Sequence, residues 1–285
     1  MTDTVSEARA KARKGDTQAM MQLADWYYFG ADGLDQSHIK SFEWLLKAAE
    51  CGHAGAQNGI GARYELGDGV AKDPQKALEW YDKAIVGGDA DACFNLGIVF
   101  EDGVLIAKDD EIAGKLYEEG AARGSVICQH RLGYKYLRGN GVRQDIPRAL
   151  ELLEFAGQSG YGSAYETLGM LNLEGELVPR NPERAYDYFS YALAHFDSDV
   201  MVATGNAPVL YALCLLTGMG CPKDRKGATE VLEKAAEAGN GVAEQVVRER
   251  IVRDPLIYTL FSPEYCEKRP VGGWDISTLL LSKFA

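Results

Sequence analysis

Apolar and small residues recur along this chain at helical spacing, in blocks that repeat every 36 residues. One column of the repeat holds an aliphatic residue followed directly by glycine: Ile60-Gly61, Leu96-Gly97, Leu132-Gly133 and Leu168-Gly169. Three residues after each glycine comes an aromatic side chain, except where Asn172 breaks the series. This spacing predicts a helix with one buried stripe. Because glycine inside a helix costs roughly 1 kcal/mol relative to alanine, we expect the backbone of a neighbouring helix to approach it closely.

A second helix is predicted in every block, after a turn that in three blocks reads Gly-x-Gly. Its N-cap residues fall in register: Asp73, Asp109, Asp145, Asn181 and Asp224. Pro74 and Pro182 follow two of these caps, at the first helical position, where a missing N–H does no harm. The second helix ends at a glycine, as at Gly88 and Gly124. Each block is therefore expected to form an antiparallel helix pair with a short loop.

The full pattern, A-x3-L-G-x2-Y-x2-G-x-G-V-x2-D-x2-K-A-x2-W-Y-x-K-A-A-x2-G, resembles Sel1-like repeats, which are relatives of tetratricopeptide repeats. The resemblance implies an all-α fold, a right-handed α-α superhelix (solenoid) of stacked antiparallel helix pairs. The copies run over these ranges: 16–52, 53–88, 89–124, 125–160, 161–196 and 197–239. The sixth copy carries an insertion of seven residues, which we place within 197–206.

Three regions follow from this count. Residues 1–15 are expected to hold an N-terminal capping helix, and residues 16–253 hold the six repeats and a closing helix. Residues 254–285 lose the pattern but carry aromatic and leucine side chains. That segment is expected to pack on the end of the array, on its concave face or on a second chain.

The charge balance narrows the classes of partner. A formal net charge of −12, from 30 basic and 42 acidic residues, argues against nucleic-acid binding. A basic protein partner would suit this charge, although an acidic balance also serves solubility. The start of the chain shows no signal peptide, and no apolar run approaches the roughly 20 residues that span a bilayer. Six cysteines without a repeat position favour reduced thiols, so we expect a cytoplasmic protein that does not bind membranes.

The resemblance to tetratricopeptide packing implies that the first helix of each pair lines the concave face. Exposed positions there form an apolar, partly aromatic strip with flanking carboxylates, and the candidate partner-binding residues are Phe94, Ile98, Glu101, His130, Tyr134, Glu166, Met170 and Leu213. Such a strip is typical of a partner groove. Two other interpretations remain open: coverage by the C-terminal segment, and burial between adjacent repeats.

Candidate chemistry is weaker. Ser37 and Lys40 match the S-x-x-K of penicillin-interacting serine enzymes, but Ser37 stands where other repeats have their N-cap residue. The four histidines share no metal-ligand spacing, and the Gly-x-Gly turns do not join a strand to a helix. Cys214 and Cys221 could bridge only if oxidised. We expect no catalytic residue, cofactor or metal.

The sequence therefore favours a non-enzymatic adaptor that binds a protein or peptide on its concave face. One alternative is an immunity protein that neutralises a cognate bacterial toxin, for which the acidic charge would suit a basic effector. A penicillin-interacting hydrolase is the other, and it is the least favoured.

Overall fold

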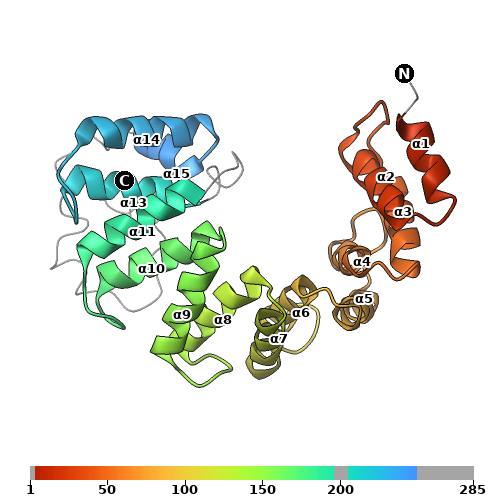
Figure 1. Ribbon diagram of the computed structural model, residues 1–285, viewed down its shortest axis with the longest axis horizontal. Coiled ribbons are helices and arrows are strands. Elements are labelled where there is room, and N and C mark those ends of the chain that lie inside the picture. Colours follow the sequence, from red (N-terminus) through yellow and green to blue (C-terminus); the bar gives the residue numbers. More distant parts are fainter. Residues whose placement is uncertain (1–3, 196–204, 249–285) are drawn as a thin grey trace. The chain divides into compact units, whose positions relative to one another are not determined.

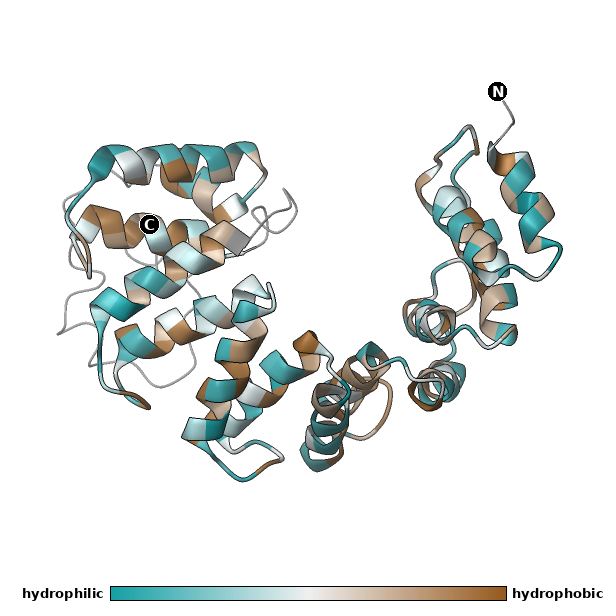
Figure 2. Cartoon of the chain, in the orientation of Figure 1, coloured by the Kyte–Doolittle hydropathy of each residue, from teal (hydrophilic) through white to brown (hydrophobic). Residues whose placement is uncertain are grey.

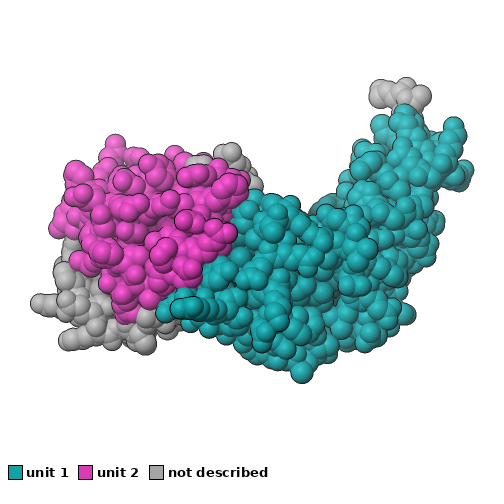
Figure 3. Space-filling model, turned by 60° about the horizontal axis from the view of Figure 1, so that its bottom comes forward, with its two compact units in different colours: residues 1–144 teal, residues 145–285 magenta. Residues whose placement is uncertain are grey.

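The computed structural model describes residues 4–195 and 205–248, and all regular structure in these ranges is α-helical. The chain divides into two compact units, residues 1–144 and 145–285 (Figure 3). The predicted C-terminal segment 254–285 and most of the predicted insertion lie outside the described residues.

Unit 1 is a series of antiparallel helix pairs, each lying against the next along the chain (Figure 1). Its helices are α1 (Thr4–Ala12), α2 (Thr17–Phe29), α3 (His38–Glu50), α4 (Ala54–Leu66), α5 (Pro74–Val86), α6 (Asp91–Asp102), α7 (Asp110–Ala122) and α8 (Val126–Arg138). The helix predicted within residues 1–15 is present as α1, which buries Val5, Ala8 and Ala12 in the core shared by α2, α3 and α4.

Unit 2 continues the pattern of helix pairs. Its described helices are α9 (Ile146–Gln158), α10 (Gly162–Glu174), α11 (Pro182–His195), α13 (Ala207–Thr217), α14 (Arg225–Glu237) and α15 (Gly241–Arg248). Apolar residues dominate α13, whereas α14 mixes polar and apolar residues (Figure 2). Side chains of α13 fill the core of this unit, where helices α11, α14 and α15 surround it. None of the described helices is long and apolar enough to cross a bilayer.

The ends of the helices are formed by the predicted residues. Asp73, Asp109 and Asp224 each accept a hydrogen bond from a backbone N–H in the first turn of the second helix. Such capping bonds satisfy backbone donors that the helix itself leaves unpaired. Each first helix ends at a glycine in the left-handed conformation, for example Gly67 with a φ of 78° and Gly139 with a φ of 70°. The local sequence therefore sets where each helix begins and ends.

Gly61, Gly97 and Gly169 face aromatic rings, so at these positions the predicted approach of a neighbouring helix backbone is wrong. A Cβ added to Gly61 would lie 2.6 Å from Cδ1 of Tyr81, which projects from the second helix of the same pair. Gly97 lies against Tyr117 in the same way, and Gly169 lies against Phe189. Because glycine has no side chain, the flat ring can lie directly on the helix backbone. The recurring glycine thus closes the helix pair internally.

The Gly-x-Gly turns join one repeat to the preceding one. The second glycine of each turn sits on the main-chain carbonyl at the start of the preceding second helix: Gly69 on His38, Gly141 on Asp110, and Gly220 on Pro182. Any Cβ at these positions would overlap that carbonyl group. These glycines also have φ values of 71° to 74°. Both the backbone conformation and the close contact therefore require glycine.

Candidate functional site

The first helices of successive pairs lie side by side in unit 1. Helix α4 contacts α6, and α6 contacts α8. Asn95 donates a hydrogen bond of 2.8 Å from Nδ2 to Oδ1 of Asn58. Ser125, the N-cap of α8, donates from Oγ to Oδ1 of Asp91 at 2.6 Å. These polar contacts join the three helices into one continuous face.

Part of the predicted strip lies on this face. Phe94 and Ile98 project from α6, and His130 and Tyr134 project from α8, and all four are half-buried. The ring of Phe94 lies 6.1 Å from that of Tyr117, measured between centroids. The remaining exposed parts of these side chains are the portion of the strip that a partner could contact.

Tyr134 carries a positively charged neighbour. The guanidinium of Arg138, one turn further along α8, lies 4.6 Å from the centroid of the Tyr134 ring. A cation over an aromatic face contributes about 0.5–1 kcal/mol at an exposed site. This contact holds the tyrosine ring in place on the surface and adds a positive charge beside it.

Glu101 has a structural role that the sequence did not reveal. Its Oε2 accepts a hydrogen bond of 2.8 Å from the hydroxyl of Tyr117 and one of 3.0 Å from Nε of Arg131. Its Oε1 lies 3.6 Å from Nζ of Lys135, and the carboxylate side chain is only 15% exposed. The prediction that Glu101 is an exposed groove carboxylate is therefore wrong. The carboxylate instead links α6, on which it lies, to α7 through Tyr117 and to α8 through Arg131 and Lys135.

Lys135 is a buried, paired charge that the repeat pattern alone does not single out. Its side chain is 1% exposed, and Nζ lies 3.2 Å from Oδ1 of Asp110. Burial of a lysine is tolerated only when it is paired, and here two carboxylates provide that pairing. A signal was present, because Val99 and Leu171 stand in the same repeat column as Lys135, although Arg63 does as well. A charge in a mostly apolar column requires a partner.

His130 is held in its neutral form. Burial, with a smaller contribution from the positive charge of Arg131, lowers the pKa of His130 to about 4. A histidine with this pKa is uncharged at neutral pH. The strip on α8 therefore presents a neutral imidazole beside the Tyr134 ring.

The three strip residues predicted in unit 2, Glu166, Met170 and Leu213, lie in three different environments. Leu213 is 2% exposed and belongs to the core, so its prediction as an exposed groove residue is wrong. Helix α13 is buried on nearly every side because α11, α14 and α15 pack around it, and Leu213 is therefore enclosed. Glu166 accepts a hydrogen bond of 2.8 Å from the backbone N–H of Ala207 at the start of α13. Burial raises the pKa of this carboxyl group. Met170 is half-buried and packs against the core.

The candidate catalytic and metal residues have structural partners. Ser37 is the N-cap of α3 and accepts a hydrogen bond from the N–H of Lys40, whose amine lies 5.3 Å from the centroid of the Tyr27 ring. His53 caps α4 through Nδ1, and His38 pairs with Asp68 at 2.6 Å. Within the described ranges, histidine, cysteine and acidic side chains form no group of three that could hold a metal.

The cysteines of the described helices are thiols. Cys214 is buried in α13 and Cys221 is half-buried, and both are free rather than bridged. Burial raises the pKa of Cys214 to about 12, and burial also raises that of Cys93 to about 11. Thiols with such pKa values are protonated and unreactive at neutral pH. They act as small apolar residues in the core.

Stacked antiparallel helix pairs, glycine-ended helices and inter-repeat contacts through Gly-x-Gly turns define an all-α repeat protein. The model of the Sel1 repeat family matches the chain six times, over residues 17–53, 54–89, 90–125, 126–161, 163–195 and 207–240. The chain therefore belongs to the Sel1 repeat family. Sel1 repeats generally mediate protein–protein interaction, and the family is generally a non-catalytic interaction scaffold.

Curated relatives match over a short stretch. The ERAD-associated E3 ubiquitin-protein ligase component HRD3A of Arabidopsis thaliana is 37% identical over 57 residues, and the chitin synthase regulator SKT5 of Saccharomyces cerevisiae is 40% identical over 57 residues. Each match covers 20% of this chain and 8% of the relative. The chain thus spans a small part of the length of these relatives, and the similarity concerns the repeat.

Solved structures share the fold. A protective antigen of uropathogenic Escherichia coli strains is 24% identical with a TM-score of 0.67, and the match covers 93% of this chain and 56% of that one. A Sel1 repeat protein from Oxalobacter formigenes is 23% identical with a TM-score of 0.65, covering 82% and 97%. An immunity protein from Pseudomonas aeruginosa is 22% identical with a TM-score of 0.52, covering 76% and 83%. At these identities the likeness establishes the fold alone.

Proposed function

We propose that this chain is a non-enzymatic adaptor that binds a partner protein through the face formed by its first helices. The observation that carries the proposal is the half-buried apolar and aromatic patch of Phe94, Ile98 and Tyr134 on α6 and α8. Large apolar side chains that remain partly exposed on adjoining helices are typical of protein contact sites. Contact between neighbouring first helices supports a concave form for this face in unit 1.

The chemistry of the patch fits a protein segment with apolar anchors. Phe94 and Ile98 offer apolar contact area on α6, while Tyr134 offers a hydroxyl that can donate or accept a hydrogen bond. His130 adds a neutral imidazole, because its pKa is about 4. An amphipathic helix or an extended segment laid along the three first helices would contact these groups together. We include a cytoplasmic location in the proposal, because the cysteines of the described ranges are free thiols, as is usual in a reducing compartment.

The test compares two double variants of equal chemistry. Ile98→Ala with Tyr134→Ala removes the proposed anchors, while Ile112→Ala with Tyr191→Ala removes exposed side chains from the second helices α7 and α11. Affinity capture from the native cell, read by mass spectrometry, should recover a specific protein with the wild type and the control but lose it with the first variant. Circular dichroism must show that both variants remain folded. Retention of the same protein by the first variant would contradict the proposal.

A second candidate function rests on the net charge of −12. An acidic surface favours association with a basic protein and accelerates the encounter. An immunity protein that neutralises a basic toxin would use this property, and one solved immunity protein has the same fold. Co-expression with a toxin encoded beside this gene is the test. Rescue of growth by the wild type supports this function, and growth arrest despite complex formation would count against it.

A further inference from the structure

An aromatic side chain joins each of two repeats to the one before it. The ring of Tyr64 on α4 meets that of Phe42 on α3 edge-on, with centroids 5.5 Å apart, and Nζ of Lys76 lies 5.2 Å from the Tyr64 centroid. In the same column two repeats later, the hydroxyl of Tyr136 on α8 donates to Oε1 of Glu118 on α7 at 3.0 Å. The aromatic residue in this column thus fills the space between its own helix pair and the preceding second helix.

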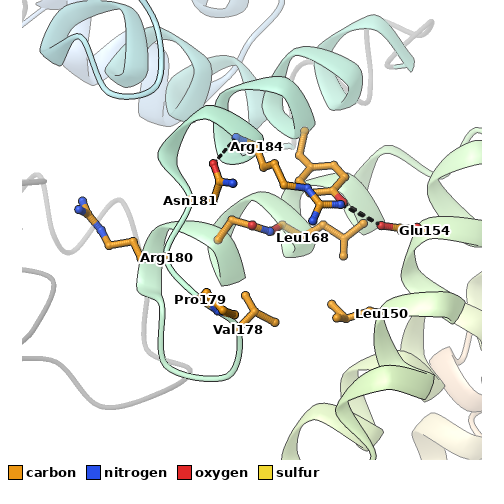
Figure 4. Close-up of a pocket in the computed structure, with 10 residues that line it drawn as sticks. Leu150, Glu154, Leu168, Val178, Pro179, Arg180, Asn181 and Arg184 are labelled. Atoms are coloured by element: carbon orange, nitrogen blue, oxygen red, sulfur yellow. Dashed lines mark hydrogen bonds and ion pairs between the residues drawn. The ribbon is translucent and has the colours of Figure 1, made fainter.

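The fifth repeat lacks this aromatic residue, because Asn172 occupies the column. Asn172 is 7% exposed, and its Nδ2 donates to the carbonyl oxygen of Leu168 in its own helix at 2.8 Å. A pocket of about 290 Å³ lies beside it, between α9 and the loop that joins α10 to α11 (Figure 4). The lining includes Leu150 and Glu154 from α9 and Val178 and Pro179 from the loop.

The lining residues are the counterparts of the groups that hold the aromatic side chain elsewhere. In steps of 36 residues, these counterparts are Leu150 for Phe42, Arg184 for Lys76, and Glu154 for Glu118. All three line the pocket. The fifth repeat has therefore kept an apolar wall, a cation and a carboxylate acceptor around a position from which the ring itself is missing.

Tyr188, which also lines the pocket, is engaged in other contacts. The hydroxyl of Tyr188 donates to Oε1 of Glu154 at 2.9 Å, and its ring stacks on that of Tyr165 with centroids 6.0 Å apart. Nη2 of Arg184 also donates to the Tyr188 hydroxyl at 3.2 Å. The Glu154 side chain is 44% exposed, so its second oxygen can accept another donor.

We propose that this pocket binds a tyrosine side chain supplied by a partner protein. The ring would pack on Leu150 and Val178, with the guanidinium of Arg184 near its face, and the phenol O–H would donate to Glu154. An aromatic ring gives a large apolar contact at low conformational cost, and the phenol adds a directed hydrogen bond. The pocket uses residues other than those of the α6 and α8 patch. The proposed pocket site extends the proposed function. It rests on that function only because the tyrosine is taken to come from a partner protein.

Binding is tested first with p-cresol, the small-molecule analogue of the tyrosine side chain. It is titrated into the full chain and followed by NMR shifts of the Asn172 side-chain amide and of the Leu150 and Leu168 methyl groups. Saturable shifts at these groups support the proposal, and toluene serves as the matched ligand without the hydroxyl. Glu154→Gln replaces a charged acceptor by a weaker neutral one, so the preference for p-cresol over toluene should fall by about threefold. An unchanged preference would overturn the assignment of Glu154.

The second test fills the pocket from inside. Asn172→Tyr restores the residue found in three other repeats, as Tyr27, Tyr64 and Tyr136, and should raise the unfolding temperature while abolishing p-cresol binding. Asn172→Ala leaves the space open and should retain binding. If Asn172→Tyr unfolds the protein, or leaves p-cresol binding intact, the pocket is no tyrosine site. Binding that appears only after Tyr258, Phe261 and Tyr265 are changed to alanine would assign the pocket to the chain itself and overturn a partner tyrosine.

These outcomes separate the pocket from the proposed function. If the α6 and α8 variant keeps its partner while p-cresol still binds at Asn172, the first-helix proposal fails and the pocket stands. When a partner is in hand, Asn172→Tyr should weaken its capture by the magnitude of one buried aromatic anchor, roughly tenfold or more. Full retention of that partner would contradict a partner tyrosine in the pocket.

Discussion

Gly61 lies directly beneath the ring of Tyr81, so close that a Cβ on the glycine would stand 2.6 Å from Cδ1 of the tyrosine. Tyr81 is 1% exposed, and its hydroxyl donates to Oε2 of Glu65 at 2.7 Å. The ring is thus fixed at both its face and its tip. This contact closes the pair α4 and α5, and equivalent contacts close α6 with α7 and α10 with α11.

Gly61→Ala should destabilise the protein even though alanine is the better helix former. Alanine gains about 1 kcal/mol in helix propensity, but overpacking against a ring that cannot move costs about 1–3 kcal/mol. We expect a net loss of up to about 2 kcal/mol in the free energy of unfolding, measured by urea denaturation. Gly241→Ala in α15 is the control, because no atom lies within 4 Å of its added Cβ. Equal effects at the two positions would contradict the ring contact.

Gly141→Ala should separate an inter-repeat contact from simple backbone strain. Gly141 and Gly124 have positive φ values of 71° and 94°, but only the Cβ at position 141 would meet the carbonyl of Asp110. Alanine in the left-handed region costs roughly 1–2 kcal/mol at either position. Gly141→Ala should therefore lower the free energy of unfolding by clearly more than Gly124→Ala does. If thermal denaturation shows the same loss of stability for Gly141→Ala and Gly124→Ala, the contact with the carbonyl of Asp110 does not contribute.

Lys135→Met should destabilise unit 1 because it leaves two carboxylates without their shared cation. Nζ of Lys135 lies 3.2 Å from Asp110 and 3.6 Å from Glu101, and the lysine side chain is 1% exposed. Loss of a charged partner in such a setting costs about 1–3 kcal/mol. Lys115→Met removes an exposed ion pair with Glu111, whose contribution is within about 1 kcal/mol. A more stable Lys135→Met variant in chemical denaturation would show that the charges are a net cost.

The stability of the fold should fall between pH 6.5 and pH 4 because of His130. Its pKa is about 4 in the folded chain, whereas an unfolded histidine has a pKa of about 6.5. In this window the unfolded state binds a proton that the folded state does not, so unfolding becomes more favourable as the pH decreases. Above pH 6.5 the effect is absent. The unfolding temperatures of the wild type and of His130→Gln should depend on pH in the same way outside this window and differently within it. In a separate NMR titration of the folded protein, a midpoint near 6.5 for His130 would contradict the prediction.

The helix pairs and their boundaries were predictable because they depend on neighbours in sequence. Asp73 and Asp109 cap a helix whose first turn follows them directly, and Gly67 ends a helix with its own φ. The resemblance to Sel1 repeats supplied the stacking of these pairs, and the family match confirms it.

The candidate site was less predictable, because exposure depends on residues from other repeats. Phe94 and Leu213 were placed on the same surface by their repeat positions, yet Phe94 is half-buried on α6 while Leu213 is enclosed in the core of unit 2. Glu101 was expected at the surface and is instead bonded to Tyr117, Arg131 and Lys135. The periodicity gives the direction of a side chain on its helix but not what lies opposite it.

The sequence by itself determined the repeat, the two helices of each pair and the positions that only glycine or a capping residue can occupy, since these follow from hydrogen bonding and sterics within a few residues. Tertiary structure alone decided which side chains remain exposed, why glycine faces a ring, and that Asn172 stands beside an open pocket. Those properties arise where separate helices meet, and packing there depends on the size and charge of residues far away in the chain.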